Sequence, residues 1–236
     1  GMDEVYVLAK EYGLRVIEDA AQGFGCERSG KAIGSNGDII CFSFDGIKNI
    51  TCGEGGAILS KDKHFIEIVR DTRLLGVQKD SEKRYAGLRS WEFDVNHQGW
   101  RYHMSNIMAS IGIAQIDRIG DFRLSRQKIA QKYLSAFKEF DYIKTLELEF
   151  FDLIPHIFVV KAVNRDELRN YLGSFEIECG LHWKPNHLLS KYSTSDNLEV
   201  TENLYKQIIT LPCHHDLLET EQEFVIQKIK EFYLDK

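Results

Sequence analysis

The sequence lacks several features that would place a protein in a functional class at once. Its 236 residues carry 30 basic and 36 acidic side chains, so no excess of positive charge is available for nucleic acid. The longest apolar runs, such as residues 38–44, are far too short to span a membrane. The five cysteines show neither CxxC spacing nor a disulfide framework. We therefore expect a cytoplasmic protein with reduced thiols.

Internal repeats and low-complexity segments are also absent, and 43% of the residues are hydrophobic against 28% charged. This balance is ordinary for a folded, water-soluble protein. The length allows one large domain or two smaller ones, each with its own core.

The first third of the chain reads as helices and strands in alternation. Amphipathic spacing predicts a helix over residues 2–13, with Val5, Leu8 and Ala9 on one face and Gly13 at its end. Three strands are then predicted at Arg15–Asp19, Asp38–Phe44 and Gly56–Ser60. Their continuous apolar runs are typical of parallel strands that are covered on both faces.

A second helix is predicted over residues 60–76, with Phe65, Ile68 and Val69 turned inward and Gly76 as its C-cap. The polar and aromatic segment 77–100 has no clear period and is predicted to be a long ordered loop.

A long helix should begin at Ser105 as N-cap and continue, with a kink near Gly120, to about Phe140. Such a helix commonly links two domains. We therefore expect domains over residues 1–120 and 121–236.

The pattern beyond this helix predicts a small α+β domain. It contains a strand over 156–163, a helix over 165–172 and an alternating strand over 175–183. In the last helix, Thr220 and Glu223 have capping-box spacing, and the buried side chains are expected to be Val225, Ile229 and Phe232.

Taken one at a time, the candidate functional residues have simpler explanations. Lys48 after a strand is most often solvated, Asp19 could be a helix cap, and Ser43 could be a core hydroxyl. The glycines of segment 30–38 lack the spacing of a phosphate-binding loop, and the adjacent His214 and His215 lack partners at metal-ligand spacing. We expect no metal.

Their joint placement indicates more. Asp19, Ser43 and Lys48 all lie at or just beyond the carboxyl ends of predicted parallel strands, where open α/β sheets bind ligands. A ligand that contacts all three residues would offer a cationic ring nitrogen to the carboxylate, a phosphate to the hydroxyl and an aldehyde to the amine. Pyridoxal phosphate fits this description.

Three segments carry a resemblance to a known family: VIEDAAQGFG, GSNGDIICFSFDGIKNITCGEGGAIL and GWRYHMSNIMASIGIAQI. They resemble the DegT/DnrJ/EryC1/StrS family of pyridoxal-phosphate (PLP) sugar aminotransferases. The later segments GLHWKPNH and TLPCHHDL are similar to the family's C-terminal motifs. The resemblance implies an α/β fold of the type I, aspartate aminotransferase-like class, with a partial, mostly parallel large domain and a small α+β C-terminal domain.

The resemblance also implies roles for individual residues. Lys48 would bind the cofactor covalently and shuttle the proton, and Asp19 would keep the pyridine nitrogen protonated. Gln22 would lie beside the ring, Ala21 against its face, and Ser43 on the phosphate. Asn49 and Arg101 complete the implied cofactor-binding set, and the implied substrate contacts are Tyr102, His182 and Trp183.

The implied reaction transfers an amino group, generally from glutamate, to a keto sugar attached to a nucleotide, in deoxyaminosugar or surface-polysaccharide synthesis. The implied assembly is a homodimer with shared active sites. Some relatives have histidine at the position of Lys48 and are dehydratases, so the lysine favours transamination.

Two departures from the family pattern matter. Arg101 and His103 stand where most relatives have asparagine and arginine, and Arg101 is equally compatible with a phosphate contact, a diphosphate contact or a surface salt bridge. The resemblance also implies that the N-terminal part of the family fold is missing, so we expect half a pocket and a chain that is inactive alone. The alternatives are a non-catalytic or regulatory remnant of the fold and a PLP-dependent sugar dehydratase or epimerase.

Overall fold

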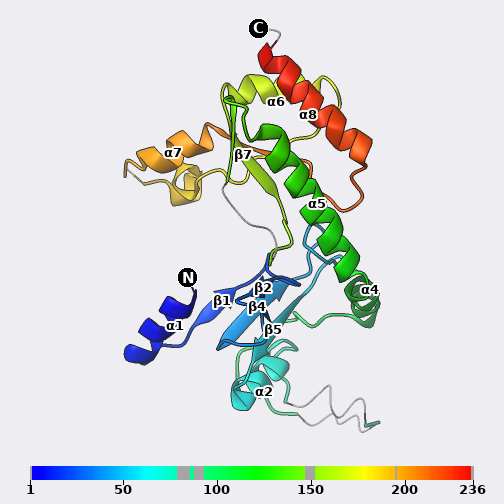
Figure 1. Cartoon of the computed structure of the whole chain (residues 1–236). Helices are drawn as coiled ribbons and strands as arrows, with labels where there is room; N and C mark the ends of the chain where they lie inside the picture. Colours follow the sequence, from blue (N-terminus) through cyan, green and yellow to red (C-terminus); the bar gives the residue numbers. More distant parts are fainter. Residues whose placement is uncertain (1, 79–85, 88–92, 147–151, 195, 235–236) are drawn as a thin grey trace. The chain divides into compact units, whose positions relative to one another are not determined.

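The computed structural model describes residues 2–78, 86–87, 93–146, 152–194 and 196–234 (Figure 1). The chain divides into two compact units, Gly1–Ile119 and Gly120–Lys236. Each unit has a hydrophobic core of its own. That these units are the two expected domains remains our proposal.

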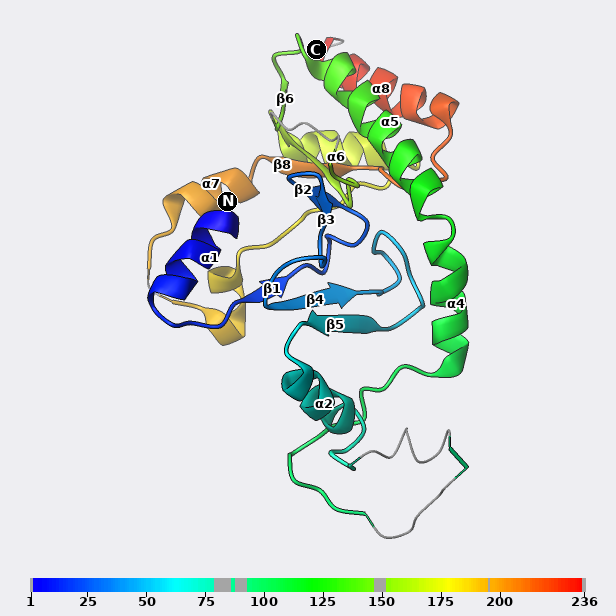
Figure 2. The same ribbon diagram turned by 60° about the horizontal axis from the view of Figure 1, so that its bottom comes forward.

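The first unit is built around a three-stranded sheet, which Figure 2 shows with β4 between β1 and β5. Its elements in the described residues are α1 (Met2–Glu11), β1 (Ile17–Asp19), β2 (Glu27–Arg28), β3 (Lys31–Ala32), β4 (Ile39–Ser43), β5 (Gly56–Ser60), α2 (Lys63–Thr72) and α4 (Asn106–Ile116).

Strand pairing confirms one half of the parallel prediction and corrects the other. β1 and β4 are parallel, with Asp19 opposite Cys41. β5 is antiparallel to β4, with Gly56 opposite Ser43. A parallel neighbour would need a crossover connection, usually a helix, whereas the loop between β4 and β5 folds back on Phe44, where the carbonyl oxygen accepts from the Cys52 N–H at 2.9 Å. The chain therefore returns beside β4 in the opposite direction.

The two faces of this sheet differ. On one face Ile40 and Phe42 are buried, and the Phe24 ring stands edge-on to Phe42 at a centroid distance of 5.2 Å. The other face carries Asp19, Cys41 and Ser43, which are half-buried or exposed. The polar candidates therefore share the face that the core of this unit does not cover.

The end of α1 is as predicted, and its buried face is predicted correctly only in part. Gly13 has a φ of +63°, and the Leu14 N–H donates to the Ala9 carbonyl at 2.7 Å. Val5 and Leu8, however, are exposed. Ala9 is buried, as predicted, and the half-buried Tyr6 donates its hydroxyl proton to Glu18 Oε1 at 2.6 Å.

Helix α2 is shorter than predicted. Asp62 caps its first turn, accepting from the Phe65 N–H at 3.0 Å, and the helix ends at Thr72. Gly76 is therefore not its C-cap. A Cβ at Gly76 would collide with the His97 carbonyl oxygen, so this glycine is required where two segments of backbone cross.

The segment predicted as a long loop is only partly described. Gln78 N–H donates to the Asp94 carbonyl at 3.2 Å, and Val77 pairs with Val95. Residues 79–85 and 88–92 lie outside the described residues, so the prediction of an ordered loop there stays a prediction.

The predicted long helix is two helices. Ser105 is the N-cap of α4, and its Oγ accepts from the Met108 N–H at 3.2 Å, as expected. α4 ends at Ile116, and α5 (Ile119–Phe137) begins after a break of two residues and stops short of Phe140. The break at Asp117–Arg118 lies close to the expected kink near Gly120, which is itself inside α5.

The second unit places helices on a small antiparallel sheet, visible at the upper part of Figure 1. Its described elements are α5, β6 (Ile143–Thr145), β7 (Phe158–Ala162), α6 (Arg165–Gly173), the 3₁₀ turns Asn186–Leu188 and Ser190–Tyr192, α7 (Glu199–Tyr205), β8 (Ile208–Leu211) and α8 (Glu219–Leu234). Strand β7 alternates strictly, with Phe158, Val160 and Ala162 buried against the helices.

Two predictions for this unit need correction. Residues 175–183 form no strand. Ile177 and Cys179 are buried as expected, but the backbone of this segment, all of which the structure describes, forms only a single bridge, from Gly180 to Thr210. Helix α8 begins at Glu219, so Thr220 lies inside it.

The first turn of α8 is instead capped by a neighbouring side chain, because Glu221 Oε2 accepts from the Leu218 N–H at 2.9 Å. The predicted core positions Val225, Ile229 and Phe232 are buried. Among the described residues, no helix is long and apolar enough to cross a bilayer.

Candidate functional site

Asp19 and Ser43 are the last residues of two neighbouring parallel strands, so both lie at the same edge of the sheet. Asp19 is opposite Cys41, and Ser43 is two residues further along β4 on the same face. Strand spacing and rise place the Cα atoms of Asp19 and Ser43 about 8 Å apart. This is the edge at which the sequence predicts a ligand.

The Asp19 carboxylate shapes the chain that follows it. Its Oδ1 accepts from the Ala21 N–H at 3.0 Å, which closes a tight turn after β1. The side chain is exposed. The second carboxylate oxygen can therefore accept a hydrogen bond from a ligand N–H group, as the expected role requires. Asp19 is a turn former, not a helix cap.

Lys48 lies in the loop between β4 and β5. Its backbone N–H donates to the Asp45 carbonyl at 3.0 Å, and both Thr51 Oγ1 and the Cys52 N–H donate to the Phe44 carbonyl. The loop is thus closed at its base, with the half-buried Lys48 near its tip. Among the residues that the structure describes, none forms a hydrogen bond or ion pair with the Lys48 ammonium group, so the amine can react or bind.

Ser43 begins this loop. Its hydroxyl oxygen accepts from the Asp45 N–H at 3.3 Å, and its own proton remains available for a ligand oxygen. The side chain is half-buried, at the rim of the sheet. Ser43 can therefore serve both as a loop former and as a donor to an anion.

Asn49, next to Lys48, is buried, with an exposed fraction of 4%. Its amide Nδ2 donates to the carbonyl oxygens of Gln22 at 3.2 Å and Phe24 at 3.0 Å. The loop that carries Lys48 is therefore fastened to the loop that follows Asp19, which brings Gln22 and Ala21 into the same neighbourhood.

The glycines after Lys48 have steric causes. A Cβ at Gly56 would lie 2.6 Å from the Phe42 carbonyl oxygen, and one at Gly55 would lie 2.6 Å from Cys52 Sγ. Gly53 has a φ of +83°. These glycines let the loop fold closely onto β4; the GEGG segment is backbone architecture rather than a set of ligand contacts.

Cys41 belongs to this site, although sequence reasoning assigned it no role. Burial raises the pKa of the Cys41 thiol, and the negative charge of Asp19 raises it further. The thiol is thus neutral near pH 7 and lies between Asp19 and Ser43 on the open face. Alternation along β4 could have identified it, since Cys41 and Ser43 are two residues apart.

Gln115 is the other residue that sequence reasoning missed. Its Oε1 accepts from the Thr51 N–H at 3.5 Å, a long contact that joins α4 to the Lys48 loop. No sequence signal points to this pairing, because the two residues lie far apart in the chain.

Arg101 and Tyr102 lie elsewhere in the first unit. Arg101 pairs with Leu74, and the Tyr102 N–H donates to the Arg73 carbonyl at 2.9 Å, so both residues are attached to the end of α2. Both side chains are exposed, and the Tyr102 ring stacks on Trp100. Within the described part of the chain, no recorded contact joins them to Asp19, Ser43 or Lys48.

His182 and Trp183 belong to the second unit. His182 Nδ1 is 2.8 Å from Thr210 Oγ1, which orients the half-buried imidazole. The Trp183 ring stands edge-on to it and is 57% exposed. The expected roles of Arg101, Tyr102, His182 and Trp183 remain proposals.

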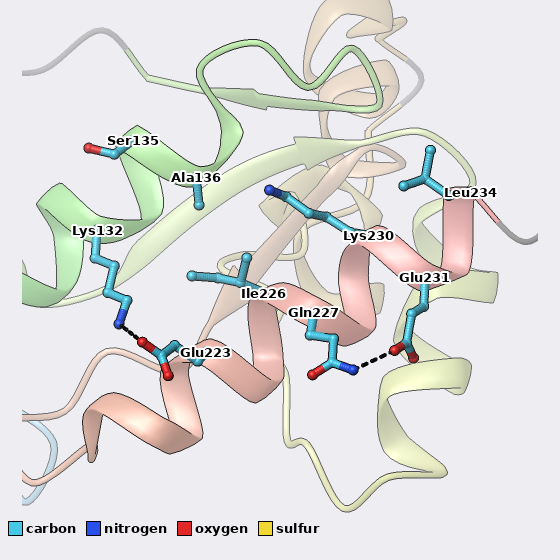
Figure 3. Close-up of a pocket in the computed structure, with 9 residues that line it drawn as sticks. All are labelled: Lys132, Ser135, Ala136, Glu223, Ile226, Gln227, Lys230, Glu231 and Leu234. Carbon is cyan, nitrogen blue, oxygen red and sulfur yellow. Dashed lines mark hydrogen bonds and ion pairs between the residues drawn. The ribbon is translucent and has the colours of Figure 1, made fainter.

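The second unit also has a surface groove of about 640 Å³ between α5 and α8 (Figure 3). Four of its polar side chains form two pairs: Lys132 binds Glu223 at 2.7 Å, and Gln227 donates to Glu231 at 2.7 Å. None of the predicted site residues lines it. Among the described residues, no group of three or more His, Cys, Asp or Glu side chains could hold a metal ion.

Known proteins resemble this chain over nearly its whole length. An uncharacterized protein of Methanocaldococcus jannaschii is 32% identical over 97% of this chain and 62% of its own length. The UDP-4-amino-4,6-dideoxy-N-acetyl-beta-L-altrosamine transaminase of Campylobacter jejuni is 29% identical over 98% of this chain and 64% of its own length. The chain thus spans less than two thirds of these curated relatives.

A solved structure is also similar to this chain over nearly its whole length. DesV of S. venezuelae, determined in complex with a ketimine intermediate, is 26% identical, covers 98% of this chain with 61% of its own, and superposes with a TM-score of 0.85. This similarity confirms the expected type I fold of PLP-dependent transferases. The model of the DegT/DnrJ/EryC1/StrS aminotransferase family matches residues 1–230. The chain therefore belongs to the DegT/DnrJ/EryC1/StrS aminotransferase family.

Proposed function

We propose that the protein is a PLP-dependent aminotransferase that transfers an amino group from glutamate to a nucleotide-linked keto sugar. One observation carries the proposal. Asp19 and Ser43 end neighbouring parallel strands on one open face, and the loop that leaves Ser43 carries Lys48 with its amine unpaired among the described residues.

The residues present fit the cofactor. An exposed carboxylate, a half-buried amine and a rim hydroxyl are the donor and acceptor set that a phosphorylated pyridine aldehyde requires. When bound, pyridoxal phosphate supplies an aldehyde that condenses with primary amines and a protonated ring that accepts electrons from the adjacent carbon.

Each side chain then has a defined task. The Asp19 carboxylate holds a proton on the ring nitrogen, and the Ser43 hydroxyl donates to a phosphate oxygen. The Lys48 amine would hold the cofactor covalently and would serve as the group that takes up and returns the proton. Gln22 and Ala21 border the ring because Asn49 holds their loop beside Lys48.

The overall reaction balances without a further reactant. The amino acid loses its amino group and becomes a 2-keto acid, a two-electron oxidation. The keto carbon of the sugar gains the amino group and the same two electrons. The name of the C. jejuni relative supports a nucleotide-linked amino sugar as the product class. The biosynthesis of deoxyaminosugars or surface polysaccharides is the corresponding pathway, and the cytoplasm is where its nucleotide sugars are expected.

We propose a homodimer in which the two copies share active sites. Support comes from α4, where Ile107, Ile113 and Ile116 are 76%, 64% and 48% exposed. Large apolar side chains that are exposed on a helix are typical of a surface that is covered in the assembled protein. No membrane or nucleic-acid partner is proposed.

The test is covalent trapping. The purified chain is incubated with pyridoxal phosphate, reduced with borohydride and digested, and the labelled peptide is identified by mass spectrometry. We expect label on Lys48, loss of the cofactor's visible absorbance band in Lys48→Ala, and at least tenfold weaker binding in Asp19→Asn. Lys10→Ala, at the exposed end of α1, is the matched control and should bind as the parent does.

The outcomes separate the alternatives. Folded parent protein that gives no Lys48-dependent label would contradict the proposal and favour a non-catalytic remnant of the fold. Label on Lys48 with glutamate-dependent formation of 2-oxoglutarate and an amino sugar would support it. Sugar turnover without amino transfer would instead indicate a dehydratase or epimerase.

A further inference from the structure

Asn49 stands out among the residues around Lys48 because it is polar, buried and only partly paired. Its amide nitrogen has two hydrogens, and both have carbonyl acceptors, at Gln22 and Phe24. The nitrogen also lies 4.0 Å from Cys26 Sγ. All three contacts go to one loop, the one that follows Asp19.

That loop is itself compact. The Gly23 N–H donates to the Ala20 carbonyl at 2.8 Å, and the Cys26 N–H donates to the Gly23 carbonyl at 3.1 Å. The Asp19 carboxylate closes its first turn. The loop is therefore held together by its own hydrogen bonds, with Asp19 at its start, and the Asn49 amide binds it in the middle.

On the other side, Asn49 is covalently next to Lys48 in the loop that is closed at Phe44 and Cys52. The side chain thus joins the loop that carries the amine to the loop that begins at the carboxylate. Any change in this link changes the position of Lys48 relative to Asp19 and Gln22.

The orientation of the amide follows from the same contacts. Asn49 Oδ1 is buried without a hydrogen-bond partner among the described residues. Rotating the amide by a half-turn would direct that oxygen at two carbonyl oxygens and leave both loops without a donor. A buried acceptor without a hydrogen-bond partner costs free energy. In this orientation the side chain of Asn49 leaves only Oδ1 without a partner and keeps both hydrogen bonds that Nδ2 donates.

We infer that Asn49 is a positioning residue, not a cofactor ligand: its side-chain amide sets the separation between the Lys48 loop and the loop of residues 20–26. This inference rests on the proposed function for its catalytic meaning, whereas the link between the loops stands by itself. It replaces the direct cofactor contact that the family resemblance implies for Asn49.

The decisive variant is Asn49→Asp, which keeps the size of the side chain, removes both N–H donors and directs a carboxylate at two carbonyl oxygens. Asn36→Asp is the matched control, because it makes the same chemical change at an exposed position of the same unit. Asn49→Ser keeps one hydrogen-bond donor, a hydroxyl, on a shorter side chain, and it replaces Asn49→Asp in the experiments if that variant does not fold.

The first measurement is hydrogen exchange of the chain without cofactor. We expect at least tenfold faster exchange in peptides covering residues 20–26 of the Asn49 variants, with residues 39–43 of β4 unchanged. Unchanged exchange in residues 20–26 would overturn the inference, whatever the cofactor does. Equally accelerated exchange across both segments would also overturn it, since it would indicate general destabilisation.

The second measurement is the binding of pyridoxal phosphate, followed by absorbance from pH 6 to 9. We expect at least tenfold weaker binding and a shifted pH midpoint of the bound cofactor's band in the Asn49 variants, with borohydride still labelling Lys48. A purely structural role would leave the affinity and midpoint of the folded fraction unchanged, which would overturn the inference. If the parent binds no cofactor, the proposed function fails, and the exchange data alone decide the role of Asn49.

Discussion

Asp19 and Cys41 lie directly opposite each other in the parallel strands β1 and β4, on the face of the sheet that also carries Ser43. The carboxylate and the thiol are close enough for the charge of Asp19 to raise the pKa of Cys41, after the larger effect of burial. This pairing places an otherwise unassigned thiol inside the proposed cofactor site.

Cys41 should be the thiol that reacts first with an aromatic disulfide reagent. It is half-buried, whereas Cys26, Cys52, Cys179 and Cys213 are buried. Because its pKa is raised, we expect labelling to be slow near pH 7 and to accelerate as the pH rises. The rate is measured by absorbance, and Cys41→Ala should remove the fast phase.

Two variants of this experiment test its physical basis. Asp19→Asn removes the neighbouring negative charge and lowers the pKa of Cys41, so labelling at pH 8 should be faster, by less than about tenfold. Pyridoxal phosphate should slow the labelling of the parent. Fast labelling of a buried cysteine would contradict the greater exposure of Cys41. No effect of Asp19→Asn would contradict the pairing of Asp19 with Cys41 across β1 and β4.

Gly56→Ala should destabilise the protein by roughly 1–3 kcal/mol, because the new Cβ would lie 2.6 Å from the Phe42 carbonyl oxygen and force β4 and β5 apart. Gly120→Ala is the control. It lies in α5 with no atom within 4 Å of its added Cβ, and should be neutral or gain up to about 1 kcal/mol. Chemical denaturation measures both, and equal stability of the two variants would contradict the close approach.

Arg126→Met should cost about 2–4 kcal/mol. Arg126 is buried in α5, and its Nη1 donates to the carbonyl oxygens of Pro155, His156 and Cys213, at 3.1, 3.2 and 2.6 Å. Burial lowers the pKa of Arg126, yet a guanidinium stays charged at neutral pH. Methionine keeps the volume but leaves these oxygens without their donor.

Lys128→Met is the matched control for Arg126. Its side chain is 73% exposed and forms a surface ion pair with Glu219, so its loss should change the free energy of unfolding by less than about 1 kcal/mol. Both variants are compared by urea denaturation. A similar small effect for both would indicate that the buried arginine does not bridge these segments.

The Arg15–Asp38 pair should make stability depend on acid pH. Arg15 binds both carboxylate oxygens of Asp38, at 2.6 and 2.7 Å, and together with the Val16 N–H it lowers the pKa of Asp38. A lowered folded-state pKa contributes stability that is complete above the unfolded value, near 4, and is lost as the pH falls further.

Asp38→Asn should therefore have a lower melting temperature than the parent at pH 7, and the difference should shrink as the pH falls from about 5 toward 2. Asp141→Asn, whose side chain is 96% exposed, is the control with little expected change. A difference that stays constant across this range would mean that the Arg15–Asp38 pair does not produce it.

The predicted elements that local pattern determines are largely present. The strands at β1, β4 and β5, the Ser105 cap and the inward positions of α8 follow from apolar runs, a hydroxyl before a helix, and 3.6-residue spacing. The resemblance of three segments also indicated the family, and the family model that matches residues 1–230 confirms it. Such signals act over a few residues, and for that reason they can be read from sequence.

The errors lie where distant segments decide. The antiparallel direction of β5 depends on how the Lys48 loop folds onto Phe44. Whether residues 175–183 form a strand depends on how far they pair with β8, and they pair only through the bridge from Gly180 to Thr210. Gly76 resembles a helix cap in sequence, but its cause is a crossing with the backbone at His97. In each case a local preference is weaker than a contact with a distant part of the chain.

By itself, the sequence determined which chemical groups are available and that Asp19, Ser43 and Lys48 lie at or just beyond the ends of strands, because composition and periodicity are local properties. Only the tertiary structure decided that Asp19 lies opposite Cys41 and that the Asn49 amide donates hydrogen bonds to the carbonyl oxygens of Gln22 and Phe24. Register and hydrogen-bond partners join residues far apart in the chain, and they are set by which distant groups the fold brings within bonding distance.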